Sequence, residues 1–216
     1  MEKDDIHIAD LRREYSRATL DEHEVADNPF VQFQRWFQQA LDSHVLDANA
    51  MVLATCGADA QPSARVVLLK AFDERGMVFY THYESHKAKD LAENPLAALL
   101  FYWKELERQV RIEGRVEKLT TQENEAYFQS RPLESQISAW ASPQSQPIAG
   151  RAVLKARVEA YRRQFEHTPI NCPPFWGGYR LIPHYFEFWQ GREHRLHDRI
   201  IYQKSADKWV IGRLAP

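Results

Sequence analysis

The chain has 216 residues, of which 44% are hydrophobic and 27% charged, a composition that excludes a largely disordered chain. Lys and Arg number 28 against 30 Asp and Glu, so no strong net field draws the protein onto nucleic acid or a membrane surface. Two cysteines, Cys56 and Cys172, are too few for a disulfide framework or a four-cysteine metal site. We therefore expect a globular protein that binds no nucleic acid and no membrane.

The N-terminal segment, residues 1 to about 27, is polar and has no sustained hydrophobic period. We expect a mobile arm there, followed by a single domain over residues 28–216. The first residues are too charged for a signal peptide, and no run of 18 apolar residues occurs, so we expect a cytoplasmic location. Asn28 and Pro29 are typical of a helix N-cap and first turn, and they predict a helix that ends near Ser43.

Short β-rich runs dominate the next part of the chain, at MVLATC, ARVVLLKAF, MVFYT, AALLFYW and RQVRIEGRVEKL. Turn residues separate most of these runs, and no crossover helix lies between most of them, which favours an antiparallel meander or barrel. One short helix, capped by Ser85, should end before Pro95. The fold class that follows is mainly β with peripheral helices.

Helices and further strands are predicted in the C-terminal half. Thr120 and Glu123 have the spacing of a capping box that opens a helix to about Gln129, and a long polar helix is expected over roughly 150–165. The segment between them, SRPLESQISAWASPQSQP, indicates either a binding segment or a surface loop. Four β-runs follow, at YRLIP, YFEFWQ, HRLHDRIIYQK and WVIGRL.

A row of cations is the first candidate site. Strand periodicity in HRLHDR places Arg195, His197 and Arg199 on one face, where three like charges favour an anionic ligand. The alternative is a solvated edge strand with carboxylates nearby. His194 and His197 would point to opposite faces of such a strand, so no metal site is expected.

Two further groups could bind phosphate. Arg65 and Lys70 flank the apolar run RVVLLK, and Lys87 follows at a short helix, which suits a phosphate cradle or simply charged strand ends. Tyr127, Arg131 and Ser135 are spaced by four, and Pro132 places Arg131 at a helix end. This second trio suits an aromatic phosphate ester, the alternative being a packed tyrosine and a solvated arginine. No Rossmann or P-loop glycine motif is present.

Ordered motifs from LRREY at Leu11 to RLAP at Arg213 resemble the pyridoxine 5′-phosphate oxidase family. The matching segments are RVVLLK (65–70), GMVFYT (76–81), LERQVRIEG (106–114), YFQSRPLESQISAW (127–140), FWGGYR (175–180) and FWQGREHRLHDR (188–199). The resemblance implies an FMN-binding split β-barrel of Greek-key type, working as a homodimer with FMN at the subunit interface. It also implies oxidation of pyridoxine or pyridoxamine 5′-phosphate to pyridoxal 5′-phosphate, with O2 as the electron acceptor and H2O2 released.

The resemblance also implies roles for individual residues. FMN contacts fall on Arg65, Val66, Val67, Leu68, Leu69, Lys70, Tyr80, Thr81, His86, Lys87, Gln109, Gln144, Ser145, Trp189 and Arg199. Substrate contacts fall on Lys70, Tyr127, Arg131, Ser135, Arg195 and His197, with Arg12, Arg13, Glu14 and Tyr15 as a lid. Arg195 and His197 are the expected catalytic pair. Two departures stand out: His86 replaces a common arginine, and Arg192 replaces a common glycine before the substrate strand.

Two other functions remain open from the sequence. Another split-barrel flavin reductase would keep Arg65 and Lys87 without the whole substrate set. A non-catalytic module that stores or delivers flavin or pyridoxal phosphate would bind in the same way without turnover. The joint presence of the five residues Tyr127, Arg131, Ser135, Arg195 and His197 favours the oxidase.

Overall fold

The computed structural model describes residues 14–15 and 17–216, and these fall into two compact units. Unit 1 comprises the described residues up to Ala48 together with Tyr102–Val110 and Phe186–Pro216. Unit 2 comprises Asn49–Phe101 and Arg111–Tyr185. The single domain over residues 28–216 stays a prediction. Within the described ranges, no helix is both long and apolar enough to span a bilayer.

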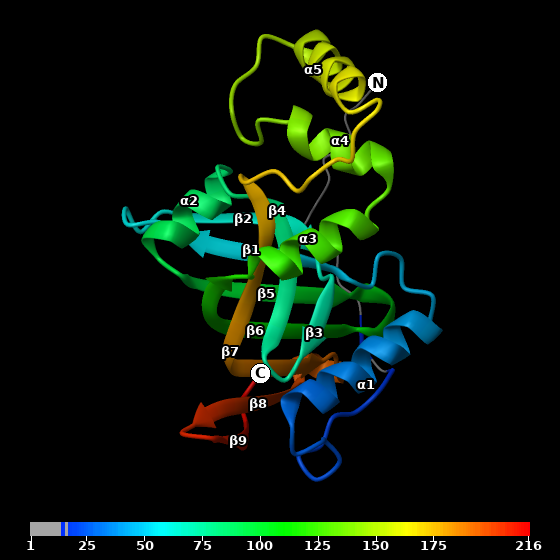
Figure 1. Ribbon diagram of the computed structural model, residues 1–216. Coiled ribbons are helices and arrows are strands. Elements are labelled where there is room, and N and C mark those ends of the chain that lie inside the picture. Colours follow the sequence, from blue (N-terminus) through cyan, green and yellow to red (C-terminus); the bar gives the residue numbers. More distant parts are fainter. Residues whose placement is uncertain (1–13, 16) are drawn as a thin grey trace, which may run out of the picture. The chain divides into compact units, whose positions relative to one another are not determined.

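Strands outnumber helices along the chain (Figure 1). The elements are α1 (Pro29–Asp42), β1 (Ala50–Cys56), β2 (Pro62–Leu68), β3 (Ala71–Asp73), β4 (Gly76–His82), α2 (His86–Glu93), β5 (Leu96–Trp103), β6 (Arg108–Lys118), α3 (Thr121–Ser130), α4 (Leu133–Ala141), α5 (Arg151–Gln164), β7 (Trp176–Gln190), β8 (Asp198–Ser205) and β9 (Lys208–Arg213). Two 3₁₀ turns, Lys104–Leu106 and Glu193–Arg195, connect strands.

Unit 2 is built around an antiparallel sheet. The hydrogen-bonded strands follow the order β2-β1-β5-β6-β7-β4-β3, in which the end of β5, the start of β6 and the end of β7 belong to unit 1. β1 pairs antiparallel with β2 and β5, and β4 pairs antiparallel with β3 and β7. Met51 and Leu53 alternate with less buried residues along β1, so one face of this strand packs on the core. These observations confirm the prediction of a mainly β, antiparallel fold with peripheral helices.

β7 differs from the prediction of two separate β-runs. It is one strand of 15 residues, Trp176–Gln190, that continues through Pro183. Proline removes one backbone donor from a strand, yet that loss does not end the strand when the flanking residues stay paired. The sequence rule that proline marks a boundary failed here because pairing with β4 fixes the residues before Pro183.

Three helices join β6 to β7 in unit 2 (Figure 1). The capping box of α3 is confirmed: Glu123 N donates to Thr120 Oγ1 at 3.2 Å, and Thr120 N donates to the Glu123 carboxylate at 2.9 Å. The polar helix α5 is also confirmed. α4 was not predicted, because the hydroxyl and amide groups of its segment indicated a binding segment or a surface loop. Ile137 and Ala141, one helical turn apart, are nevertheless both buried.

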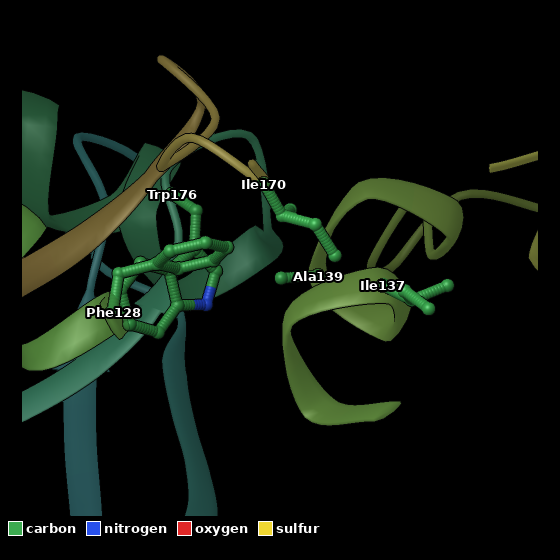
Figure 2. Close-up of a cluster of buried hydrophobic side chains, with 5 residues drawn as sticks. All are labelled: Phe128, Ile137, Ala139, Ile170 and Trp176. Carbon is green, nitrogen blue, oxygen red and sulfur yellow. The ribbon is translucent and has the colours of Figure 1, made fainter. Parts of the chain in front are cut away.

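A buried cluster holds the corner between α3 and α4 against the start of β7. Figure 2 shows it: Phe128 comes from α3, Ile137 and Ala139 from α4, and Trp176 from β7, with Ile170 preceding that strand. Phe128 meets the Trp176 ring edge-on, with 5.4 Å between centroids. Because Arg131 stands at this corner, the cluster fixes the position of its backbone.

In unit 1, α1 begins and ends as predicted. Asn28 Oδ1 accepts a hydrogen bond from Phe30 N at 2.8 Å, and Pro29 occupies the first turn. Trp36 packs edge-on against Phe188 of β7, with 5.3 Å between ring centroids. The strands β8 and β9 form an antiparallel pair.

The described part of the N-terminal segment contacts the rest of unit 1. Arg213 donates to Leu20 O at 3.0 Å and to Asp198 Oδ1 at 2.8 Å, and it also binds the Glu22 carboxylate. Leu20 N donates to Asp198 Oδ2 at 3.1 Å. Mobility of the segment stays a prediction, and Arg12 and Arg13 lie outside the described residues.

The predicted strand through HRLHDR is wrong at its start. A 3₁₀ turn occupies Glu193–Arg195, and β8 begins only at Asp198. The residues His194 and Arg195 have φ of 56° and 63°, the left-handed region, so the alternation of strand faces does not apply to them. The local charge pattern could not reveal this turn, which the chain needs because β8 pairs with β7 directly before it. Arg192 has an extended φ of −135°, so its replacement of glycine strains nothing.

Candidate active site

Unit 2 contains an open cavity of about 440 Å³, within the rough 300–1,000 Å³ range of small-molecule sites. Seven predicted site residues line it: Lys70, Tyr80, Thr81, Tyr127, Arg131, Ser135 and Gln144. Predicted FMN residues and predicted substrate residues therefore meet in one cavity. The lining also includes Trp176, His82, Ser138 and Ser142, which the sequence did not single out.

Three stacked rings line one side of this cavity. Tyr80 and Tyr127 lie 3.9 Å apart between centroids at 19°, and Tyr80 and Trp176 lie 5.3 Å apart at 15°. The guanidinium carbon of Arg131 lies 4.6 Å from the Trp176 ring centroid. A flat aromatic surface with a cation beside it suits a flat, anionic ligand. Trp176 belongs to the motif FWGGYR, so a sequence signal for it was present.

Arg131 is the clearest indication of an anion-binding site. Its Nη1 is buried and has no hydrogen-bond partner among the described residues. Burial lowers the pKa of this guanidinium below its usual value. Gln136 Nε2 donates to Arg131 O at 2.9 Å, which fixes the backbone of the α3–α4 corner. An unpaired buried donor costs about 1–3 kcal/mol, and an incoming anion would remove that cost.

Lys87 is a buried cation among neutral oxygens. Its Nζ donates to Gln144 Oε1 at 2.8 Å, Thr81 Oγ1 at 3.1 Å and Ser85 Oγ at 3.3 Å. Burial, and then the nearby charge of Arg65, lower the pKa of Lys87 to about 8. In the part of the chain that is described, no carboxylate forms an ion pair with it. This donor set fits a phosphate group, as FMN carries.

Arg65 and His86 both lie near a buried carboxylate. Arg65 Nη1 donates to Thr55 Oγ1 at 2.6 Å, and its Nη2 lies 3.8 Å from Asp90 Oδ2. His86 Nε2 lies 3.6 Å from Asp90 Oδ1, and its side chain is 65% exposed. The sequence analysis missed Asp90, although its spacing of four from His86 on a helix was a usable signal.

The other predicted FMN residues of unit 2 lie at or next to these groups. Along β2, Arg65 and Val67 are partly buried while Val66 and Leu68 are exposed, as alternation in a strand requires. Leu69 is buried and Lys70 follows it, its backbone N donating to Val78 O at 2.8 Å. Ser145 follows Gln144 with φ of 68°.

His197 lies in unit 1, in contact with two aromatic rings. Trp189 is 4.6 Å away and Tyr15 is 5.7 Å away, measured between ring centroids. Arg192 N donates to His197 Nδ1 at 3.0 Å. Burial, and then the charge of Arg195, lower the pKa of His197.

The remaining predicted residues of unit 1 are not gathered as one row. Arg195 is exposed on the turn, and Arg199 on β8 donates from Nε to Glu187 Oε1 at 2.8 Å. Gln109 lies on β6 and is partly buried. Glu14 accepts a hydrogen bond from His194 N at 3.3 Å. The expected row of three cations is therefore replaced by an exposed Arg195, a histidine that accepts from backbone, and an arginine paired with a carboxylate.

Lys87 gives the protein without cofactor a pH dependence that can be measured. Its pKa is about 8 when folded and near 10.5 when unfolded, so between these values the unfolded state binds more protons and stability rises with pH. Below pH 8 the folded state carries the full cost of the buried charge. We expect the free energy of unfolding of the parent, relative to Lys87→Met, to rise from pH 8 to pH 10. If urea titrations gave the same difference in free energy of unfolding between parent and Lys87→Met at pH 8 and pH 10, the lowered pKa of Lys87 would be contradicted.

Residues 37–165 match the family model described as pyridoxamine 5′-phosphate oxidase. The chain belongs to the pyridoxamine 5′-phosphate oxidase family. Residues 176–216 match the pyridoxine 5′-phosphate oxidase C-terminal dimerisation region, which supports a homodimer.

Relatives cover almost the whole chain. A pyridoxine/pyridoxamine 5′-phosphate oxidase from Burkholderia vietnamiensis is 58% identical over 97% of this chain and 99% of that protein. The protein of the same name from Acaryochloris marina is 55% identical over 97% of this chain and 95% of its own length.

Two solved structures are similar. PhzG from Burkholderia lata, in complex with tetrahydrophenazine-1-carboxylic acid, has a TM-score of 0.87 and 31% identity over 93% of this chain and all of its own. An FMN-binding protein related to pyridoxamine 5′-phosphate oxidase from Nostoc punctiforme has a TM-score of 0.70 and 18% identity over 89% of this chain and all of its own, which supports the fold alone.

Family membership confirms two predictions, the split-barrel fold and FMN as the cofactor. The contacts of individual residues with FMN and substrate stay predictions. The structure supports them to the extent that Lys87 and Arg131 offer buried donors that no described carboxylate satisfies.

Proposed function

We propose that this protein oxidises pyridoxine 5′-phosphate and pyridoxamine 5′-phosphate to pyridoxal 5′-phosphate, with O2 as the electron acceptor and H2O2 released. It would do so in the cytoplasm, as part of pyridoxal phosphate biosynthesis, as a homodimer with FMN at the subunit interface. The observation that carries the proposal is the unit 2 cavity, where Arg131 Nη1, which has no hydrogen-bond partner in the described part of the chain, lies beside a stacked aromatic wall.

The substrate phosphate is assigned to Lys70, Tyr127, Arg131 and Ser135. A phosphate monoester carries up to two negative charges and needs several charge-assisted donors, which two cations and two hydroxyls supply. All four residues line the same cavity. Nη1 of Arg131, already desolvated, would gain most from an anionic ligand, because no described residue accepts a hydrogen bond from it.

FMN is assigned to the group around Lys87. The Lys87 ammonium, Thr81 hydroxyl and Gln144 amide form one hydrogen-bonded cluster. The cation Arg65 is close enough to lower the pKa of Lys87. When bound, FMN supplies the redox chemistry by accepting a hydride from the substrate carbon attached to ring position 4. The tasks left to the protein are binding, orientation and the placement of charge.

Arg195 and His197 are assigned to the ring end of the substrate. Arginine keeps its proton at neutral pH, so Arg195 contributes orientation and electrostatic stabilisation. Overall, the alcohol loses two hydrogens to O2, which becomes H2O2. The amine loses two hydrogens in the same way, and its imine product takes up water to give the aldehyde and ammonia.

A peroxide assay tests the proposal. Purified protein loaded with FMN should release H2O2 and form the aldehyde when pyridoxine 5′-phosphate is added. Pyridoxine without phosphate is the matched control and should react poorly, because the phosphate donors have no partner. Because the PhzG structure holds tetrahydrophenazine-1-carboxylic acid, that acid is the competing substrate to test. Oxidation of this acid alone, or flavin binding without any turnover, would overturn the proposal.

His86 offers a test of the FMN phosphate site. Histidine loses its charge near neutral pH, whereas the arginine common at this position keeps it. If His86 assists Lys87 and Arg65 in holding the phosphate, His86→Arg should bind FMN about 1 kcal/mol more tightly at pH 8, the worth of one charge-assisted contact. Fluorescence titration of the protein without cofactor between pH 6 and 8 measures this. Identical pH profiles for parent and variant would remove His86 from the site.

A further inference from the structure

The turn before β8 brings the ring of His197 back onto the backbone of Arg192. Leu196 N donates to Glu193 O at 3.1 Å, and the left-handed residues His194 and Arg195 reverse the chain. Arg192 N then lies 3.0 Å from His197 Nδ1. Residue 192 contributes only its backbone N–H to this contact, so the contact does not require any particular side chain at position 192.

The bond fixes the tautomer of His197. A backbone N–H can only donate, so Nδ1 must offer a lone pair, and the single proton of the neutral imidazole is then on Nε2. Adding a second proton at Nδ1 would break the bond to Arg192. Among the described residues, Nε2 has no hydrogen-bond partner.

The surroundings of the ring favour the neutral form. Tyr15 meets the ring edge-on at 74°, and Trp189 lies against it at 46°. The charged groups that face it are Arg195, which lowers its pKa together with burial, and Asp198 and Glu14, which act in the opposite direction. Burial and Arg195 outweigh the two carboxylates, and the pKa of His197 falls below its ordinary value.

We propose that His197 is a fixed hydrogen-bond donor through Nε2 and is not the group that accepts the substrate's proton. The proposal rests on the proposed function, in which Arg195 and His197 meet the substrate ring. Since a guanidinium also only donates, the pair offers two donors and no base. Such a pair holds an electron-rich oxygen or nitrogen of the substrate in place, and the proton acceptor lies outside it.

Nitrogen NMR tests the tautomer directly. In a long-range ¹H–¹⁵N correlation spectrum of the FMN-loaded protein at pH 8, the lone-pair nitrogen of His197 should resonate well downfield and be identified as Nδ1. The signals are assigned by their loss in His197→Gln. Arg192→Ala keeps the backbone donor and should leave the pattern unchanged. A downfield Nε2, or a ring protonated on both nitrogens, would overturn the proposal.

Two amide variants of His197 test whether Nε2 donates a hydrogen bond to the bound ligand. The glutamine NH2 group occupies a position close to that of Nε2, whereas the asparagine NH2 group is close to that of Nδ1. Affinity for pyridoxal 5′-phosphate, measured by its absorbance change on binding, should be nearly kept in His197→Gln. It should fall about tenfold in His197→Asn, the loss expected for one hydrogen bond. The reverse order would contradict a donor at Nε2.

The peroxide assay and the NMR measurement together distinguish a failure of this inference from a failure of the proposed function. If the parent does not oxidise pyridoxine 5′-phosphate while Nδ1 carries the lone pair, the proposed function fails and the tautomer stands. If the parent turns over while Nε2 carries the lone pair, the proposed function stands and His197 is free to act as a base.

Discussion

Arg195→Met and His197→Ala should each give a folded, FMN-bound protein that has lost most of its oxidation of pyridoxine 5′-phosphate. Arg195 is exposed on the 3₁₀ turn and His197 is only partly buried, so neither side chain belongs to the core. Losing a donor that stabilises developing charge typically lowers kcat by roughly 10²–10³-fold. Steady-state kcat/KM, with FMN content measured by absorbance, is the readout.

The matched control is His194→Asn in the same turn. His194 is exposed, lies next to Arg195 and has φ of 56°, a conformation that asparagine tolerates well. This variant should keep near-parental kcat/KM, because the side chain is not part of the proposed pair. If Arg195→Met or His197→Ala also keeps near-normal kcat/KM, the catalytic assignment is wrong.

Local signals in the sequence predicted most helix ends correctly. The cap of α1 at Asn28 and the capping box of Thr120 and Glu123 use side chains within three residues of each other, so the sequence contains the whole interaction. The antiparallel pairing of the strands was predicted from the lack of crossover helices between most of the β-runs. These features need no information about distant residues.

Where a feature depends on residues distant in the sequence, the prediction missed it or was wrong. α4 looks polar in sequence, and the burial of Ile137 and Ala139 becomes visible only in the cluster that they form with Trp176. The turn at Glu193–Arg195 breaks the strand pattern because β7 must reverse to pair with β8. A local period cannot report either constraint.

In the candidate site, too, some residues could be selected from the sequence, whereas their contacts could not. Charge and spacing selected Arg65, Lys87 and Arg131 from the sequence, because cationic side chains and helix N-termini favour anions. The sequence could not show that Trp176 lies beside Arg131, or that Asp90 lies beside Arg65, because both contacts arise from packing. The roles of individual residues came from resemblance to a family, and position in one cavity supports seven of them.

Arg131→Ala should raise the KM for pyridoxine 5′-phosphate by roughly 10–100-fold, the effect of losing about 1.5–3 kcal/mol of charge-assisted hydrogen bonding. Turnover should stay close to parental, since the phosphate is not among the reacting atoms and is bound equally in ground and transition states. Folding should survive, because Nη1 has no described protein partner to lose. Arg162→Ala on α5, an exposed arginine paired with Glu134 and Glu159, is the control and should not change KM.

Pyridoxine without phosphate makes this test specific. The parent and Arg131→Ala should oxidise it with the same low kcat/KM, because the group that Arg131 binds is absent from it. Arg131→Lys keeps a charge but loses the forked pair of donors and the flat contact with Trp176, so its KM should fall between those of parent and alanine variant. An unchanged KM for the phosphorylated substrate would remove Arg131 from the phosphate site. A loss that is equal for both substrates would show instead that Arg131 supports the cavity wall through Trp176.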